Sequence, residues 1–206
     1  MAIKPILFNT EMVRAILDGR KSCTRRIVKH DVEAILNSPY HKEHPEVEDE
    51  QIISKLCIPP YQPGDILYVR ETWQYLYELD GNEQVVEDTG KYYYAATDTI
   101  PFDTYVDASG VTHERVPWHP SIHMPKEAAR IWLKVTDVRV ERLQDMTDDD
   151  AEAEGCFDYT STALGFPDVW DSTIKGSDLD RYGWDANPWV WVIEFERCDK
   201  PESKVL

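Results

Sequence analysis

The sequence lacks the short motifs that identify several enzyme classes. It contains no Walker loop, no G-x-G-x-x-G fingerprint, no H-E-x-x-H zinc motif and no internal repeat. Its four cysteines are widely spaced and include no C-x-x-C pair, which is typical of reduced thiols in a cytosolic protein. No cysteine, third histidine or apolar helical frame supports a metal site at His41 and His44, so we interpret them as loop histidines. We therefore expect neither a metal nor another cofactor.

Long apolar stretches are missing as well. No run approaches the ~18 residues that a membrane span needs, and the first residues lack the apolar region of a signal peptide. Positive charge is scarce, since 22 lysines and arginines face 39 aspartates and glutamates for a net charge of −17. This balance argues against a protein that coats nucleic acid with its whole surface. We expect a cytoplasmic protein without a membrane partner; a neutral ligand, or a nucleic acid held by one basic patch, stays open.

The chain does contain an ordered series of short strands and helices. Alternation and β-propensity predict strands over Ile3–Phe8, Ser22–Val28, Ile66–Trp73, Lys91–Thr97, Ala129–Leu143 and Trp189–Glu196. Helical periodicity and capping residues predict helices over Glu11–Asp18, Asp31–Asn37, Thr147–Glu154 and Asp168–Lys175. A break in phase at Thr136 and Asp137 predicts a β-bulge. Consecutive β segments favour an α+β domain built on a small mixed β-barrel, with short helices and long loop insertions.

Three polar segments are predicted to be loops. Residues 38–50 read as a surface loop, and residues 79–89 are acidic and loop-like. Residues 100–114 read as a loop or hairpin, with a turn at Ala108–Gly110.

One short segment reverses the charge of the protein. Residues 14–29 hold six basic side chains against Asp18 alone, and residues 141–158 hold eight acidic ones against Arg142 alone. If the two segments meet, the acidic helix covers the basic turn. That contact is either plain electrostatic docking or a means of aiming Glu154, at the negative helix end, toward Lys21 and Thr24. The aspartates at 148–150 need no such role, because acids at a helix start interact favourably with its dipole.

Further candidates for substrate-binding residues lie in two aromatic segments. Arg70 and Glu71 end an apolar strand, where they form a rim salt bridge or face a site together with Trp73. His123 belongs to a rigid Pro-rich segment and serves structural hydrogen bonding or a site. We assign substrate-binding roles to these four residues and to Arg26, and no residue to a metal. Trp189 and Trp191 alternate on the last strand and are expected to line the core or the barrel wall.

Four motifs in order carry a resemblance to a known family. They are G-R-K-x-x-T-x-R at Gly19–Arg26, G-D-x-L-x-V at Gly64–Val69, A-E-x-E at Ala151–Glu154 and V-I-E-F at Val192–Phe195. The chain resembles the ASCH domain family, whose fold is a PUA-like β-barrel. The resemblance implies one domain over residues 1–199, with insertions near 74–120 and 157–188 and a flexible tail at 200–206. The extended pattern is similar to ASCH-type proteins of tailed phages and prophages, which would place the protein in a host cytoplasm.

The resemblance also implies an activity. The best-defined enzyme of the wider family is an amidohydrolase that deacetylates N4-acetylcytidine, and its catalytic residues fall on Lys21, Thr24 and Glu154. Thr24 would attack the amide, either Lys21 or Glu154 would take its proton, and Arg26 or a backbone N–H would stabilise the oxyanion. This chain departs from that enzyme at Ser22, where the family has threonine, and at Cys23 and Arg25, which replace apolar residues; these changes bear on the substrate pocket.

Two other functions fit the same sequence. The first is a module of phage origin that binds RNA or a modified nucleotide, or a nuclease using the same lysine and glutamate, in which Trp73 or Trp118 stacks a base. The second is a phage structural or host-interaction protein with an acidic docking surface. The partner is expected to be a modified nucleoside or RNA, and the oligomeric state stays open.

Overall fold

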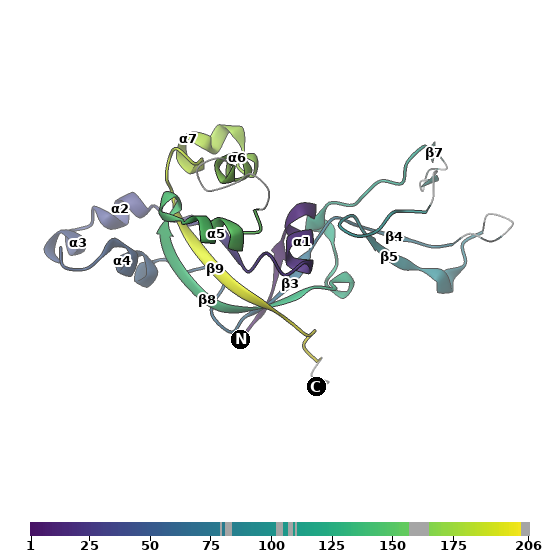
Figure 1. The fold of residues 1–206 in the computed structure, drawn as a ribbon, viewed down its shortest axis with the longest axis horizontal. Helices are drawn as coiled ribbons and strands as arrows, with labels where there is room; N and C mark the ends of the chain where they lie inside the picture. Colours follow the sequence, from purple (N-terminus) through teal and green to yellow (C-terminus); the bar gives the residue numbers. More distant parts are fainter. Residues whose placement is uncertain are drawn as a thin grey trace.

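The computed structural model describes residues 1–78, 80, 84–101, 105, 106, 109, 111–156 and 165–202. Its centre is a mixed five-stranded sheet in the order β1-β3-β8-β9-β2 (Figure 1). The strands are β1 (Ile3–Leu7), β2 (Cys23–Ile27), β3 (Ile66–Arg70), β8 (Trp132–Arg142) and β9 (Trp189–Cys198). β1 and β3 are parallel and the other three pairings are antiparallel. The predicted α+β class is confirmed.

The sheet is curled but open. β8 and β9 bend strongly along their length, and β1 and β2 form the two edges (Figure 1). In the part of the chain that the structure describes, no strand pairing joins these edges into a closed barrel. The Arg26 side chain crosses between them, because its Nη2 donates a hydrogen bond to the Leu7 carbonyl at 3.2 Å. In a closed barrel, backbone hydrogen bonds would join the two edge strands. Here a side-chain hydrogen bond connects β2 with β1 instead.

The main core fills the concave side of this sheet. Trp189, Trp191, Ile193 and Phe195 alternate inward along β9, and all four are buried, as predicted for the two tryptophans. The predicted bulge is also confirmed, since the register of β8 against β9 shifts between Val135 and Asp137.

Short helices cover the ends of the sheet. α1 (Thr10–Leu17) is capped by Asn9, whose side chain accepts the Met12 N–H, and buries Val13 and Ile16. α5 (Asp148–Ala153) begins with a capping box in which Thr147 and Asp150 bond each other's backbone N–H. α6 (Phe166–Ser172) and α7 (Leu179–Tyr182) lie beyond it, near the ends of β8 and β9 (Figure 1).

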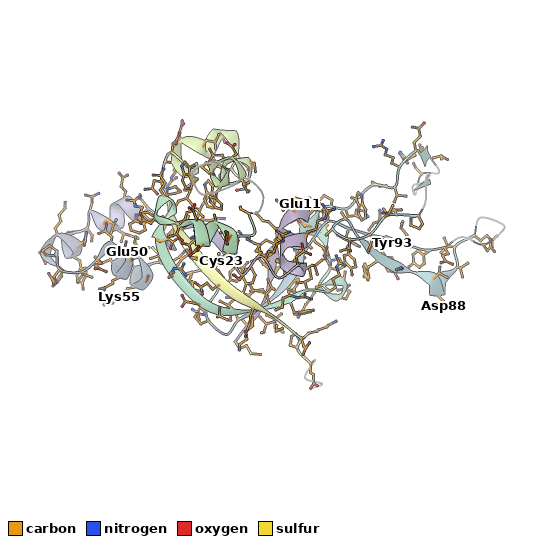
Figure 2. All side chains as sticks on the ribbon, in the orientation of Figure 1. Glu11, Cys23, Glu50, Lys55, Asp88 and Tyr93 are labelled. Atoms are coloured by element: carbon orange, nitrogen blue, oxygen red, sulfur yellow. The ribbon has the colours of Figure 1, made fainter. Side chains whose placement is uncertain are left out.

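Two extensions leave the body in opposite directions. One consists of α2 (Val32–Leu36), α3 (Pro39–Glu43) and α4 (Asp49–Leu56); the other is a two-stranded arm of β4 (Trp73–Leu76) and β5 (Lys91–Tyr94), with the small β6 (Tyr105–Val106) and β7 (Thr112–His113) beside it. Figure 2 shows Cys23 in the body, Glu50 and Lys55 on the helical extension, and Tyr93 and Asp88 on the arm. Short 3-10 turns occur at Glu87–Thr89, Ser121–His123, Lys126–Ala128, Leu143–Asp145 and Gly176–Asp178.

Several predicted boundaries are corrected. The loop predicted over 38–50 is wrong, because Ser38 caps α3, with Pro39 in its first turn, and α4 begins at Asp49. The strand predicted to reach Trp73 ends at Arg70, where the Glu71 N–H meets the Met124 sulfur at 3.2 Å. The predicted turn at Ala108–Gly110 falls mostly outside the described residues, as do residues 79, 81–83, 157–164 and 203–206 of the predicted loop, insertion and tail.

Within the described residues, no helix is long and apolar enough to cross a membrane. The same residues contain no group of three or more His, Cys, Asp or Glu side chains placed to hold a metal ion.

Asp65 fastens the first strand to the start of β3. Its carboxylate accepts the N–H of Ala2 at 2.8 Å and of Gln62 at 3.2 Å, and pairs with Lys4 at 2.8 Å. Burial alone would raise the pKa of Asp65, but Lys4 and the two N–H donors hold it below the usual value. The ionised carboxylate therefore stabilises the fold at neutral pH.

We expect Asp65→Asn to lower the free energy of unfolding by about 1–2 kcal/mol at pH 7, because the charge-assisted bonds are lost. A group whose pKa is lowered on folding contributes above its unfolded value and loses that contribution as the pH falls through the folded value. The gap between variant and wild type should therefore shrink below about pH 4. Urea unfolding at pH 7, 5 and 3 measures this difference in the free energy of unfolding. Asp185→Asn, at an exposed position, is the control. A gap that is constant with pH would contradict the ionic role.

Candidate active site

The basic turn after α1 lies against the end of the acidic helix α5. Ala15 accepts the backbone N–H of Arg20 at 2.8 Å and of Lys21 at 3.1 Å, and Ser22 donates to the Ala153 carbonyl at 2.8 Å. These bonds fix the start of β2 against α5. Segments separated by more than 130 positions in the sequence thereby meet, which satisfies the condition under which the acidic helix covers the basic turn.

Gly155 permits the close approach of the two elements. Its φ is +87°, a left-handed conformation that favours glycine after a helix end. A Cβ at this position would stand 2.8 Å from the Ala15 Cβ and 3.1 Å from the Lys21 Cβ. Any larger residue would push α5 away from the turn, and Glu154 would move with it.

Lys21 and Glu154 form a buried ion pair. Lys21 Nζ lies 2.6 Å from Glu154 Oε2 and also donates to the Glu154 backbone carbonyl at 2.8 Å. The Lys21 side chain is 0% exposed and the Glu154 side chain 5% exposed. Two charges are tolerated at such depth only when each satisfies the other, so the pair has a fixed geometry.

Arg25 holds the second oxygen of the same carboxylate. Its Nη1 lies 3.5 Å from Glu154 Oε1, while its Nη2 lies 2.7 Å from Glu141 Oε1 and 3.3 Å from Asp150 Oδ1. Burial alone would lower the pKa of Arg25, but Glu154 and Glu141 raise it above the usual value. Arg25 is therefore a permanent cation surrounded by carboxylates, and it orients Glu154 from the side opposite Lys21.

Thr24 and Arg26 lie on the other face of β2. In the register with β9, Thr24 is opposite Ile193 and Arg26 opposite Trp191, so both face the main core, as the strand period predicted. Arg26 Nη1 donates to Thr24 Oγ1 at 2.7 Å. A guanidinium bonded to a hydroxyl oxygen stabilises negative charge that develops there.

The Phe8 ring joins the two faces of the site. Lys21 Nζ lies 5.3 Å and the Arg26 guanidinium carbon 5.5 Å from its ring centroid. Phe8 therefore contacts a cation from each side of the site.

A cavity of about 610 Å³ opens onto these groups. Thr24, Arg26 and Glu154 line it together with Arg25. Its apolar walls combine aliphatic side chains with four aromatic residues: Tyr61, Phe166, Trp170 and Trp191. α6 supplies Phe166 and Trp170, so the insertion predicted near 157–188 builds one wall of the cavity.

Cys23 is not a nucleophile in this arrangement. Burial, and next Glu154, raise the pKa of its thiol to about 12. The thiolate is the reactive form of cysteine. The hydroxyl of Thr24 is therefore the better candidate in this motif.

The structure places Thr24, Arg26 and Glu154 along one cavity and pairs Lys21 with Glu154, but the four other predicted substrate contacts lie elsewhere. Arg70, Glu71, Trp73 and His123 are not among the residues that line the cavity. Arg130 holds Glu71 through two bonds of 2.9 Å, and the Glu71 side chain is buried. The described residues therefore do not show the predicted rim salt bridge between Arg70 and Glu71. Trp73 stacks with Tyr92 and His119, and His123 is exposed.

Sequence reasoning missed several residues of the cavity. Tyr61 reaches it from the Pro-rich turn before β3, and Lys29 and His30 from the segment after β2. Lys29 is one of the six basic side chains of residues 14–29, and the sequence assigns it no role at the site. No periodicity marks such positions, because their place depends on how the sheet curls.

No family model matches the chain, and no curated protein or solved structure matches it either. The resemblance to the ASCH family thus rests on the four sequence motifs.

Proposed function

We propose that the protein is an ASCH-type amidohydrolase that removes an acyl group from an N-acylated cytosine nucleoside or a related modified base. The observation that carries this proposal is the buried Lys21–Glu154 pair at 2.6 Å, whose carboxylate lines the same cavity as Thr24 and Arg26. A nucleophile, an acid–base group and fixed cations are the parts that amide hydrolysis needs.

The first step is acyl transfer to Thr24. Its Oγ attacks the carbonyl carbon of the acyl group, and its proton passes to Glu154. We assign the base role to Glu154 because Lys21, donating two hydrogen bonds beside a carboxylate, acts as a cation. Arg26 Nη1, already 2.7 Å from Thr24 Oγ1, stabilises the oxyanion that forms when the carbonyl π bond opens.

The second step releases the base. The tetrahedral intermediate collapses, the bond from carbon to the cytosine N4 breaks, and N4 takes the proton from Glu154. Water then hydrolyses the ester on Thr24, with Glu154 again accepting and returning a proton. Acetate and cytidine are the products when the acyl group is acetyl.

The fold supports the family part of the proposal. A curled mixed sheet with an edge strand that carries the G-R-K-x-x-T-x-R motif is compatible with a PUA-like barrel that is incompletely closed. Aromatic walls from Tyr61, Trp170 and Trp191 provide flat surfaces against which a pyrimidine stacks.

Binding of a modified nucleotide without chemistry is the second candidate. Among the described residues, no hydrogen bond joins Thr24 to Lys21 or Glu154, and Arg26 is the partner of its hydroxyl. A cavity that combines cations with aromatic walls suits recognition of a nucleotide by itself.

Mass spectrometry of N4-acetylcytidine incubated with the purified protein tests the enzymatic proposal. We expect cytidine and acetate in equal amounts from the wild type. Lys21→Ala should give no product above background, because it removes the cation that fixes Glu154. Circular dichroism establishes that the variant is folded.

A panel of other N-acylated nucleosides extends the assay. Absence of turnover across the panel would reject the amidohydrolase. If Arg26→Gln then weakens nucleoside binding, the second candidate is supported in its place.

A further inference from the structure

The charge of the cavity is opposite to that of the protein. Acids outnumber lysines and arginines 39 to 22 in the chain. Among the described residues that line the cavity, Arg25, Arg26, Lys29 and His30 can carry positive charge, and Glu154 is the one carboxylate. Field lines concentrate in a cleft lined by one sign of charge, so this cavity attracts an anion despite the acidic surface.

The cations of the cavity differ in how fully they are neutralised. Glu154 is shared by Lys21 and Arg25, and Arg25 has Glu141 and Asp150 in addition. The hydrogen bonds of Arg26 go to uncharged oxygens, namely Thr24 Oγ1, the Arg25 carbonyl and the Leu7 carbonyl. Among the described residues, Arg26 thus has no carboxylate as a hydrogen-bond partner, although Glu154 interacts with it electrostatically.

Lys29 and His30 lie at the exposed edge of the cavity. No ion pair within the described residues involves either side chain. The nearest acid in sequence, Asp31, is engaged in capping α2, where its Oδ1 accepts the Ala34 N–H at 3.0 Å. The edge of the cavity therefore presents a lysine and an imidazole toward the solvent without a carboxylate partner among those residues.

We propose that the substrate carries a phosphate group, which Lys29 and His30 bind at the mouth of the cavity while its base lies between the aromatic walls. This inference rests on the proposed function and narrows its substrate from a nucleoside to a nucleotide. A phosphate offers oxygens that accept charge-assisted hydrogen bonds from both side chains.

The spacing along β2 suits a nucleotide. Lys29 follows Arg26 by three residues, which is about 10 Å along an extended chain. Arg26 is bonded to Thr24, the group that attacks the base substituent, so Lys29 marks a point displaced from the reacting atoms. The base and the phosphate of a nucleotide are likewise at opposite ends of the ribose. The phosphate can belong to a free mononucleotide or to an RNA strand, because both present the same anion.

Isothermal titration calorimetry with unmodified ligands tests the subsite without requiring catalysis. Cytidine, cytidine 5′-monophosphate and the trinucleotide CpCpC are titrated into the wild type, Lys29→Gln and Lys42→Gln. Lys42 is exposed on α3 and provides the same charge change away from the cavity.

We expect at least one phosphorylated ligand to bind the wild type about tenfold more tightly than cytidine, as expected for a single charge-assisted contact. Higher salt should reduce this preference. Lys29→Gln should remove most of it, and Lys42→Gln should leave it unchanged. Tighter binding of the mononucleotide would identify a free nucleotide as the source of the phosphate, and tighter binding of CpCpC would identify RNA.

Equal binding of the three ligands, or no binding of any, would overturn the phosphate subsite even if N4-acetylcytidine is hydrolysed. A preference for phosphorylated ligands that Lys29→Gln leaves intact would overturn the assignment to Lys29. Turnover of N-acylated nucleosides is measured separately. A phosphate preference without turnover would reject the amidohydrolase and retain the subsite, so the two failures are distinguishable.

Discussion

Glu154→Gln is expected to lower kcat for N4-acetylcytidine about 10³-fold, within the range for loss of a general acid–base group. The amide still accepts a hydrogen bond from Lys21, but it no longer takes the Thr24 proton or returns it to the leaving base. Steady-state kinetics by chromatography of released cytidine measures the effect. Glu152→Gln is the matched control, because Glu152 lies on the same helix, is exposed and is not among the residues that line the cavity.

A structural role for the pair is separated from a catalytic one by a double variant. Lys21→Met combined with Glu154→Leu replaces the buried charges by apolar side chains, an exchange that is often neutral or stabilising. We expect this protein to fold with a melting temperature near that of the wild type and to be inactive. An active double variant, or a Glu154→Gln enzyme with unchanged kcat, would contradict the assigned mechanism.

Arg25→Met is expected to lower the free energy of unfolding by about 3 kcal/mol, the lower end of the cost of removing one partner of a buried ion pair. The change leaves Glu154, Glu141 and Asp150 without their shared buried cation. We expect a loss of stability at the lower end of that range because Arg139 also contacts Glu141 at 3.4 Å and Asp150 at 3.4 Å. Urea unfolding at pH 7 measures the difference.

Arg20→Met is the control for this change. Arg20 belongs to the same basic run, but its side chain is 31% exposed and pairs with Asp18 near the surface. A pair of this kind is worth about 0–1 kcal/mol. If Arg25→Met costs no more than Arg20→Met, the buried network does not stabilise the junction between β2 and α5.

Local patterns were sufficient for much of the fold. Alternation along Trp189–Glu196 predicted β9, which extends to Cys198, and its inward tryptophans; the break in phase at Thr136 predicted the bulge of β8. The capping box at Thr147 predicted the start of α5. These features depend on residues within a few positions of one another, which is why they are legible in the sequence. The helix α3 was not predicted, because its five residues bury no apolar face and so show no helical pattern of apolar positions.

The residues of the candidate site, like the elements of the fold, were predicted only in part from the sequence. The opposite charges of residues 14–29 and 141–158 made a contact between the two segments one interpretation of the sequence, and the structure pairs Lys21 with Glu154 there. Residue type alone suggested substrate contacts at Arg70, Glu71, Trp73 and His123. The structure locates these four residues away from the cavity. Glu71 in particular is taken up by Arg130, a residue 59 positions later that no local pattern connects to it.

The sequence by itself determined the strands of the central sheet, the faces of β2 and the charge complementarity between α5 and the basic turn. These follow from backbone periodicity and from the sign of the charges. Only the tertiary structure decided that Glu154 points at Lys21, that Arg26 bonds Thr24, and that α6, Tyr61 and Lys29 surround one cavity. The reason is physical: these contacts depend on how far the sheet curls and on the left-handed turn at Gly155, and both are set by packing among residues distant in the chain.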